Sequence, residues 1–188
     1  MKDSHKPVSL YLEPIITATS DVVTKRVTVM NVAGFVEGND PLLKNEYVII
    51  GAHYDHLGMG GEGSGSRAPD KPAVHNGADD NASGTAGVIE LAQKFSLNSS
   101  RLKRSVIFVA FTGEEMGLLG SKEFVNKPPV DLKKVNAMIN MDMIGRLNPG
   151  TNTISIGGTG TSVEADSLLK ILETNRSFKV THSSDGYG

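Results

Sequence analysis

Residues 46–52, EYVIIGA, are a short and almost continuous apolar run, and His53 follows directly behind them. A run of this length and composition is typical of a strand that is buried on both faces of a sheet. Residues 105–111, SVIFVAF, repeat the pattern and lead straight into residues 112–115, TGEE. Each of these two predicted strands therefore delivers acidic or imidazole side chains at its carboxyl end.

The segments outward from these two strands alternate between strand and helix patterns. Further strands are expected in residues 22–36 (one or two), 135–144, 153–156 and 178–182, and helices in residues 81–96, 118–125 and 163–175. Residues 58–77 are rich in Gly, Ser and Pro and predict a long loop. This alternation favours an α/β fold: a three-layer sandwich with a mixed, largely parallel central sheet and helices on both faces. In such folds ligands gather at the carboxyl ends of the strands.

The composition is typical of a single globular domain and restricts its partners and chemistry. Nineteen Lys and Arg against 21 Asp and Glu give a net charge of -2, and without a basic tail we expect no nucleic-acid partner. The longest apolar run, residues 106–111, is too short for a membrane span, and we expect no signal peptide in the chain. Because the chain has no Cys, any metal must be held by His, Asp or Glu.

Other common functional motifs are weak or absent from the sequence. Residues 58–63, GMGGEG, formally match the dinucleotide-binding fingerprint, but Ser, Arg and Pro follow where a helix should begin. The sequence contains no His-Glu-x-x-His, no Walker loop and no Gly-x-Ser-x-Gly. We therefore do not expect a zinc-helix peptidase, a phosphate-loop protein or a serine hydrolase.

Acidic and imidazole side chains gather where the predicted strands end. The members of this set are His53, Asp55, Glu114, Glu115 and Asp142, with Asp79 and Asp80 added at a loop-to-helix junction. Carboxylates crowded in this way repel one another unless cations offset their charge. Imidazole mixed with carboxylate, without sulfur, suits zinc, manganese or cobalt, and zinc is our first expectation.

Four motifs in order carry a resemblance to a known family. They are GAHYDH at 51–56, GADDNASG at 77–84, FTGEEMGLLGS at 111–121 and NMDMIGR at 140–146. Together they resemble the motifs of the co-catalytic di-zinc aminopeptidases. These are zinc-dependent exopeptidases of the bacterial leucyl aminopeptidase type, related to glutamate carboxypeptidase and glutaminyl cyclase. The resemblance runs from about Asn31 to Gly188 and implies the zinc-exopeptidase fold, a peptide substrate with a free N-terminus, and a secreted or periplasmic location.

The resemblance also implies a role for each matching residue. The metal ligands it implies are His53 and Asp142 on one zinc, Glu115 on the other, and Asp79 as the bridging carboxylate. Glu114 becomes the general base that serves a metal-bridging hydroxide, and Asp55 the acceptor that fixes the His53 tautomer. A cis peptide is implied between Asp79 and Asp80. His56 and His75 match no motif role, and we expect them to be ordinary polar loop residues.

The chain departs from the family pattern at its C-terminal end. The family's fifth ligand, a His, is expected beyond Gly188, and we do not accept His182 as its substitute. We therefore expect residues 1–188 to be a single, C-terminally incomplete catalytic domain with residues 1–20 as a linker or stub. The second zinc should then be weak or absent, and we expect this chain to lack activity by itself. Two alternatives stay open, a non-catalytic metal-binding or interaction module and a single-zinc acyltransferase of the glutaminyl-cyclase type. Side-chain specificity and oligomeric state also stay open.

Overall fold

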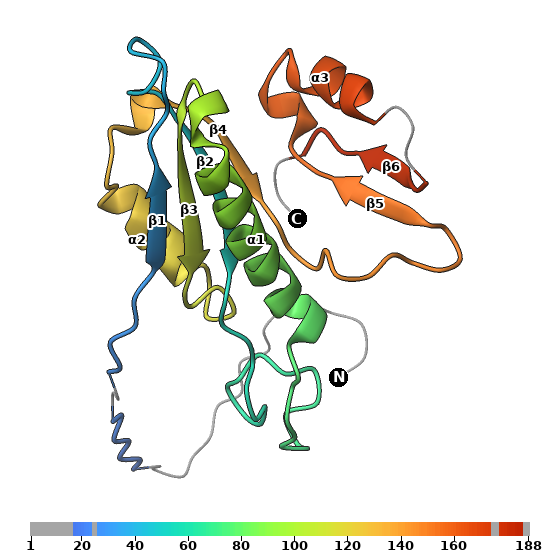
Figure 1. Ribbon diagram of the computed structural model, residues 1–188. Helices are drawn as coiled ribbons and strands as arrows, with labels where there is room; N and C mark the ends of the chain where they lie inside the picture. The colour runs from blue at the N-terminus through green and yellow to red at the C-terminus, as the bar shows by residue number, and fades with distance from the viewer. Residues whose placement is uncertain (1–16, 24–25, 174–176, 186–188) are drawn as a thin grey trace.

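The computed structural model describes residues 17–23, 26–173 and 177–185, and its centre is a four-stranded sheet (Figure 1). The strands lie in the order β1-β3-β2-β4. Their bounds are β1 Val32–Val36, β2 Tyr47–His53, β3 Ser105–Phe111 and β4 Val135–Asn140. Strand β2 pairs in parallel with both β3 and β4, while β1 runs antiparallel to β3 at the edge. The mixed, mostly parallel sheet predicted from the sequence is confirmed.

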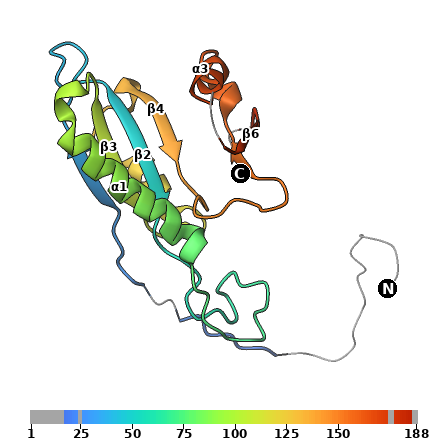
Figure 2. The same ribbon diagram turned by 45° about the vertical axis from the view of Figure 1, so that its right-hand side comes forward.

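Helices cover both faces of this sheet because the apolar side chains of β2 and β3 alternate between the two faces. Helix α1 (Gly84–Leu97) covers one face and helix α2 (Leu119–Asn126) the other (Figures 1 and 2). The core on the α1 side contains Ile50, Ala52, Val88, Val106 and Phe108. The core on the α2 side contains Ile49, Ile107, Val109, Phe111 and Phe124. An edge-to-face aromatic pair joins each helix to β3, with centroid distances of 5.9 Å for Phe95–Phe108 and 5.6 Å for Phe111–Phe124.

The last part of the described chain forms a smaller unit beside β4. Strands β5 (Thr153–Ile156) and β6 (Lys179–His182) pair in parallel as a separate two-stranded sheet, with helix α3 (Ala165–Leu172) beside it (Figure 1). The sequence suggested that these strands belong to the central sheet. They do not, because the segment after β4 turns away from the sheet and is bound near the start of α1. Within the described ranges, β4 therefore has a strand partner only on its β2 side.

Several element bounds differ from the sequence prediction. The predicted strand at 135–144 ends at Asn140, and the strand region 22–36 contracts to β1. The predicted helix at 81–96 begins at Gly84 and follows an irregular turn, η1 (Ala78–Ser83), in which Asp80 and Asn81 are not helical. Short 3-10 turns complete the list: η2 Ser99–Arg101, η3 Leu132–Lys134 and η4 Thr159–Thr161.

The expected stub at 1–20 falls mostly on residues 1–16, which lie outside the described residues. Residues 17–23 are exposed and have no regular secondary structure. No helix in the described part of the chain is both long and apolar enough to cross a membrane.

The core on the α1 side generates a stability prediction. Phe108 is 3% exposed and contacts Phe95 of α1, so Phe108→Ala should leave a cavity and lower the free energy of unfolding by about 3–5 kcal/mol. Phe35→Ala makes the same change at a side chain that is 58% exposed and should cost much less. Urea unfolding followed by circular dichroism measures both. Equal losses for the two variants would contradict the assignment of the core.

Candidate metal centre

Parallel pairing brings the carboxyl ends of three strands to one edge of the sheet. His53 is the last residue of β2 and pairs with Phe111, the last residue of β3. Glu114 and Glu115 follow β3 after a two-residue turn, and Asp142 lies just beyond the end of β4. The strand ends therefore place imidazole and carboxylate groups together, as the sequence predicted.

The first group of potential metal ligands is built around His53. Its Nε2 lies 3.3 Å from Asp80 Oδ1 and 3.5 Å from Asp142 Oδ1. The imidazole is 3% exposed, and its Nδ1 lies 3.1 Å from the backbone carbonyl oxygen of Asp55. An Nδ1–H that donates to this carbonyl leaves the Nε2 lone pair facing the two carboxylates, which is the tautomer that a metal requires.

A second group lies directly beside the first. His56 Nδ1 is 2.7 Å from Glu115 Oε1 and 3.9 Å from Asp80 Oδ1. In each group the ligand atoms lie within 4.8 Å of one another. Asp80 belongs to both groups, and the same oxygen, Oδ1, makes the close approaches to His53 and to His56. The two groups of potential metal ligands therefore share one carboxylate.

The structure does not bring Asp79, the expected bridging residue, into either group. Its Oδ2 lies 3.2 Å from Arg146 Nε, and its Oδ1 accepts a hydrogen bond of 3.0 Å from the backbone N–H of Gly145. The turn η1 sends the two adjacent carboxylates in different directions, so only Asp80 faces the imidazoles. The cis peptide is also one residue later than expected, between Asp80 and Asn81.

Asn81, which the sequence analysis did not single out, is part of the frame of this site. It is 2% exposed, its Nδ2 donates to the Met141 carbonyl at 3.0 Å, and its Oδ1 accepts from the backbone N–H of Met143 at 3.3 Å. The two residues that flank Asp80 in sequence thus both bind the segment that carries Asp142. In the sequence, the only signal for this role was an Asn inside the GADDNASG motif. An Asn at that position is explained equally well as a cap at the start of a helix.

Asp55 has a different contact from the one expected. Its carboxylate accepts hydrogen bonds from the backbone N–H groups of Glu114 (3.0 Å) and Glu115 (3.2 Å). The carboxylate oxygen lies 3.8 Å from His53 Nδ1, so the imidazole is oriented by the backbone carbonyl of Asp55 and not by its side chain. Asp55 therefore ties the exit of β2 to the exit of β3.

Glu114 faces a small cavity of about 170 Å³ that His53 and Asp142 also line. Partial burial raises the pKa of the Glu114 carboxyl above its ordinary value. The neighbouring charges of Glu115, Asp142 and Asp55 raise this pKa further, while His53 opposes the shift. Glu114 thus lines the same cavity as His53 and Asp142, in a position to exchange a proton with a molecule bound there.

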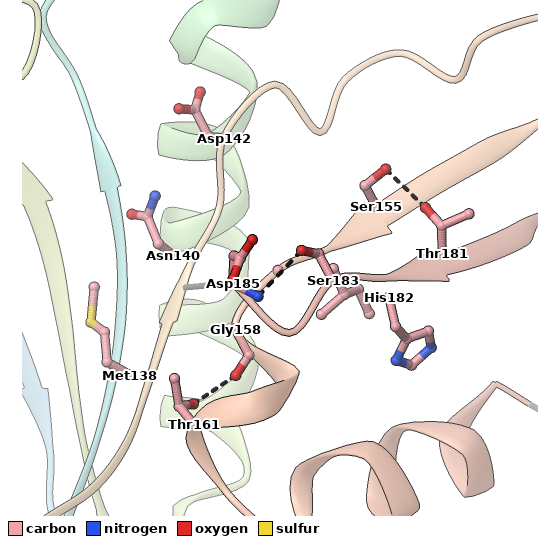
Figure 3. Close-up of a pocket in the computed structure, with 12 residues that line it drawn as sticks. Met138, Asn140, Asp142, Ser155, Gly158, Thr161, Thr181, His182, Ser183 and Asp185 are labelled. Atoms are coloured by element: carbon pink, nitrogen blue, oxygen red, sulfur yellow. Dashed lines mark hydrogen bonds between the residues drawn. The ribbon is translucent and has the colours of Figure 1, made fainter. Parts of the chain in front are cut away.

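A larger groove of about 700 Å³ extends from Asp142 to the β5–β6 sheet (Figure 3). Met138 and Asn140 line one side, and Thr181 and His182 line the other. Although His182 borders this groove, it belongs to neither ligand group, and its Nε2 lies 2.6 Å from Glu173 Oε1.

Comparison with known sequences finds relatives that are named as aminopeptidases. The chain is 32% identical over 146 residues to a "Probable leucine aminopeptidase" of Arthroderma benhamiae, covering 74% of this chain and 36% of that protein. It is 33% identical over 114 residues to "Leupeptin-inactivating enzyme 1" of Streptomyces exfoliatus, covering 60% of this chain and 22% of that protein. The chain thus spans only about a third or less of the length of these relatives.

Comparison with solved structures shows the fold. LapB from Legionella pneumophila has a TM-score of 0.57 and 23% identity, over 84% of this chain and 43% of that one. The glutaminyl cyclase of Porphyromonas gingivalis has a TM-score of 0.57 and 20% identity, over 82% and 56%. Residues 31–185 match the model of peptidase family M28, so nearly the whole described chain is covered. The chain therefore belongs to peptidase family M28.

Proposed function

We propose that this chain forms the metal centre of a zinc-dependent aminopeptidase that removes N-terminal residues from peptides. The observation that carries the proposal is the pair of ligand groups that share Asp80 Oδ1 at the carboxyl ends of β2, β3 and β4. Membership of peptidase family M28 and relatives that are named leucine aminopeptidases support the same activity.

The donor atoms of the first group fit zinc. Zinc binds imidazole nitrogen and carboxylate oxygen at 2.0–2.2 Å, so two ligands on one tetrahedral ion lie about 3.3–3.6 Å apart. The separations from His53 Nε2 to Asp80 and to Asp142 are 3.3 and 3.5 Å. His53, Asp80 and Asp142 would hold the first zinc, and Asp80 with Glu115 would belong to the second. The bridging role then moves from Asp79 to Asp80.

Residues around the metal ligands would carry out the proton transfers of the reaction. When bound, two zinc ions polarise the peptide carbonyl and make water acidic enough to act as a nucleophile at neutral pH. Glu114 takes up a proton in the cavity beside His53 and passes it to the leaving amine as a general acid. The raised pKa of Glu114 suits a group that must both accept and release a proton. The hydrogen bond from the backbone N–H of Glu114 to the Asp55 carboxylate fixes the backbone from which the Glu114 side chain extends.

Replacement of Glu114 tests the chemistry separately from metal binding. Glu114→Gln keeps the size of the side chain but removes its basicity, so kcat for an aminoacyl p-nitroanilide should fall by about 10²- to 10⁴-fold. Zinc content measured by elemental analysis should stay at the wild-type value, because Glu114 belongs to neither ligand group. Unchanged turnover would contradict the assignment of Glu114 as the base.

Replacement of the two adjacent aspartates tests which one bridges the metals. Asp80→Asn removes a ligand common to both groups and should weaken zinc binding by more than about 100-fold, a larger effect than loss of an outer hydrogen-bond partner produces. Asp79→Asn is the matched control, and it should retain zinc although it alters the contact to Arg146. The two quantities to compare are zinc per chain after desalting and the affinity in a competition titration. The reverse ranking of the variants would restore Asp79 as the bridge.

The alternatives that the sequence left open fit these contacts less well. A single-zinc acyltransferase needs one ligand group, whereas Asp80 is shared by two. A non-catalytic module has no need for Glu114 in the cavity beside His53. A zinc-loaded protein without activity toward any aminoacyl anilide would favour the non-catalytic module. The secreted or periplasmic location stays a prediction, and the oligomeric state stays open.

A further inference from the structure

Asn31, the residue before strand β1, uses its side-chain amide to join two points of the chain beyond the end of β3. Its Oδ1 accepts a hydrogen bond from the backbone N–H of Thr112 at 3.1 Å, and its Nδ2 donates to the carbonyl oxygen of Gly120 at 2.8 Å. Thr112 directly follows β3, and Gly120 lies in the first turn of α2. Asn31 therefore holds both ends of the segment that connects β3 to α2.

This connecting segment is the turn that carries Glu114 and Glu115. Its backbone closes on itself, because the N–H of Gly120 donates to the Thr112 carbonyl at 2.8 Å. Thr112 is 7% exposed, and a Cβ atom at Gly120 would overlap both Asn31 Oδ1 and the Thr112 carbonyl. The two ends of the turn and the Asn31 amide are thus packed in direct contact.

The backbone at Asn31 is itself fixed on both sides. The residue before it, Met30, accepts a hydrogen bond from the Tyr54 hydroxyl at 2.7 Å, and the residue after it, Val32, pairs with Ala110 of β3. Tyr54 is the first residue after β2, so the segment before β1 is attached to the ends of both neighbouring strands. A side chain that extends from this backbone can hold the turn in one place.

The turn also contains a residue in an unfavourable backbone conformation. Leu118 has a φ of +62°, in the left-handed region that a residue with a Cβ rarely adopts, and its N–H donates to the Glu114 carbonyl at 2.9 Å. Residues in such conformations persist where the surrounding structure fixes them. The two hydrogen bonds from Asn31 are contacts of this kind, because they bind the turn on either side of Leu118.

Asp55 and Asn31 bind different parts of the turn from different strands. Asp55 follows β2 and accepts hydrogen bonds from the N–H groups of Glu114 and Glu115 in the middle of the turn. Asn31 precedes β1 and binds the two ends of the turn. The Glu114 side chain extends from this backbone to the cavity that His53 also lines. Its place in the cavity therefore depends on Asn31 as well as on Asp55.

We propose that Asn31 is a positioning residue for the general base Glu114, an inference that rests on the role proposed for Glu114 above. Asn31 belongs to neither ligand group and acts through the backbone of the turn. Without its amide, the buried N–H of Thr112 loses its acceptor and the turn gains other conformations. Because a displacement of about 1 Å at a reacting group can lower the rate about 100-fold, this loss should reduce kcat.

The first test compares Asn31→Ala and Asn31→Asp with the matched control Asn39→Ala. Asn39 lies beyond the other end of β1, and its Nδ2 donates to the Ser100 carbonyl at 3.3 Å. Asn31→Ala removes both side-chain hydrogen bonds, whereas Asn31→Asp keeps an acceptor for the Thr112 N–H. With saturating zinc and an aminoacyl p-nitroanilide, kcat should fall about 10- to 100-fold in Asn31→Ala and by a smaller factor in Asn31→Asp. KM should not change, and Asn39→Ala should keep the wild-type kcat.

A double-mutant cycle separates an effect through Glu114 from a general loosening of the fold. In a Glu114→Gln background the base is already absent, so Asn31→Ala should change kcat little. The same loss in both backgrounds would overturn the proposal. Circular dichroism checks that each variant is folded. An unchanged kcat in Asn31→Ala, or in Asn31→Asp should Asn31→Ala fail to fold, would also overturn it.

Hydrogen exchange followed residue by residue by NMR tests the turn without any activity measurement. The N–H groups of Glu114 and Glu115 should exchange about 5-fold faster in Asn31→Ala than in the wild type, the factor that corresponds to the net contribution of one hydrogen bond. Asn39→Ala should leave both rates unchanged. Unchanged rates in Asn31→Ala would overturn the positioning role. A wild-type protein that binds zinc but cleaves no aminoacyl anilide would instead overturn the proposed function, and faster exchange in Asn31→Ala would still support Asn31 as the residue that fixes the turn.

Discussion

Strand β2 is hydrogen-bonded to parallel strands on both sides, and the whole candidate site depends on this pairing. Because β2, β3 and β4 run in the same direction, their carboxyl ends meet at one edge, and the register pairs His53 with Phe111 and Gly51 with Asn140. The interiors of β2 and β3 are fixed by the two cores, one on each face of the sheet. The polar groups beyond the strand ends are therefore placed by a packed scaffold, although they lie on irregular segments.

This placement brings several carboxylates close together, where their negative charges repel one another. The carboxylates differ in the partners that offset this repulsion. Carboxylates that stay outside the ligand groups have other partners: Asp79 contacts Arg146 and the N–H of Gly145, and Asp55 accepts two backbone N–H groups. The carboxylates inside the groups have imidazoles and one another as neighbours. Such a set is stable near neutral pH only when cations or protons offset the negative charge. Their hydrogen-bond partners thus distinguish the carboxylates that stabilise the surrounding backbone from the carboxylates that would bind metal.

The sequence predicted the layers of the fold and most of the site, and its failures have local physical causes. Strand β3 has the predicted bounds because its run of 7 mostly apolar residues is short for a helix and rich in β-branched and aromatic side chains. Two neighbouring aspartates have no such signal, since the backbone of η1 alone decides that Asp80 faces the imidazoles. The position of His56 depends on a contact with Glu115 across 59 positions and on the fit of its ring against Gly77, neither of which is a local pattern. The separation of β5 and β6 from the main sheet likewise follows from distant contacts of residues 141–145.

The adjacent acids Glu114 and Glu115 show how one short turn can serve two chemical roles. Asp55 binds the N–H groups of both residues with one carboxylate, so their main chain is fixed as a unit. From that unit Glu115 reaches His56, while Glu114 lines the cavity beside His53 and Asp142. A ligand must stay ionised, whereas a base must exchange its proton, and two neighbouring carboxylates can do both only if their surroundings differ. The surroundings do differ: partial burial raises the pKa of Glu114, while Glu115 lies 2.7 Å from the His56 imidazole.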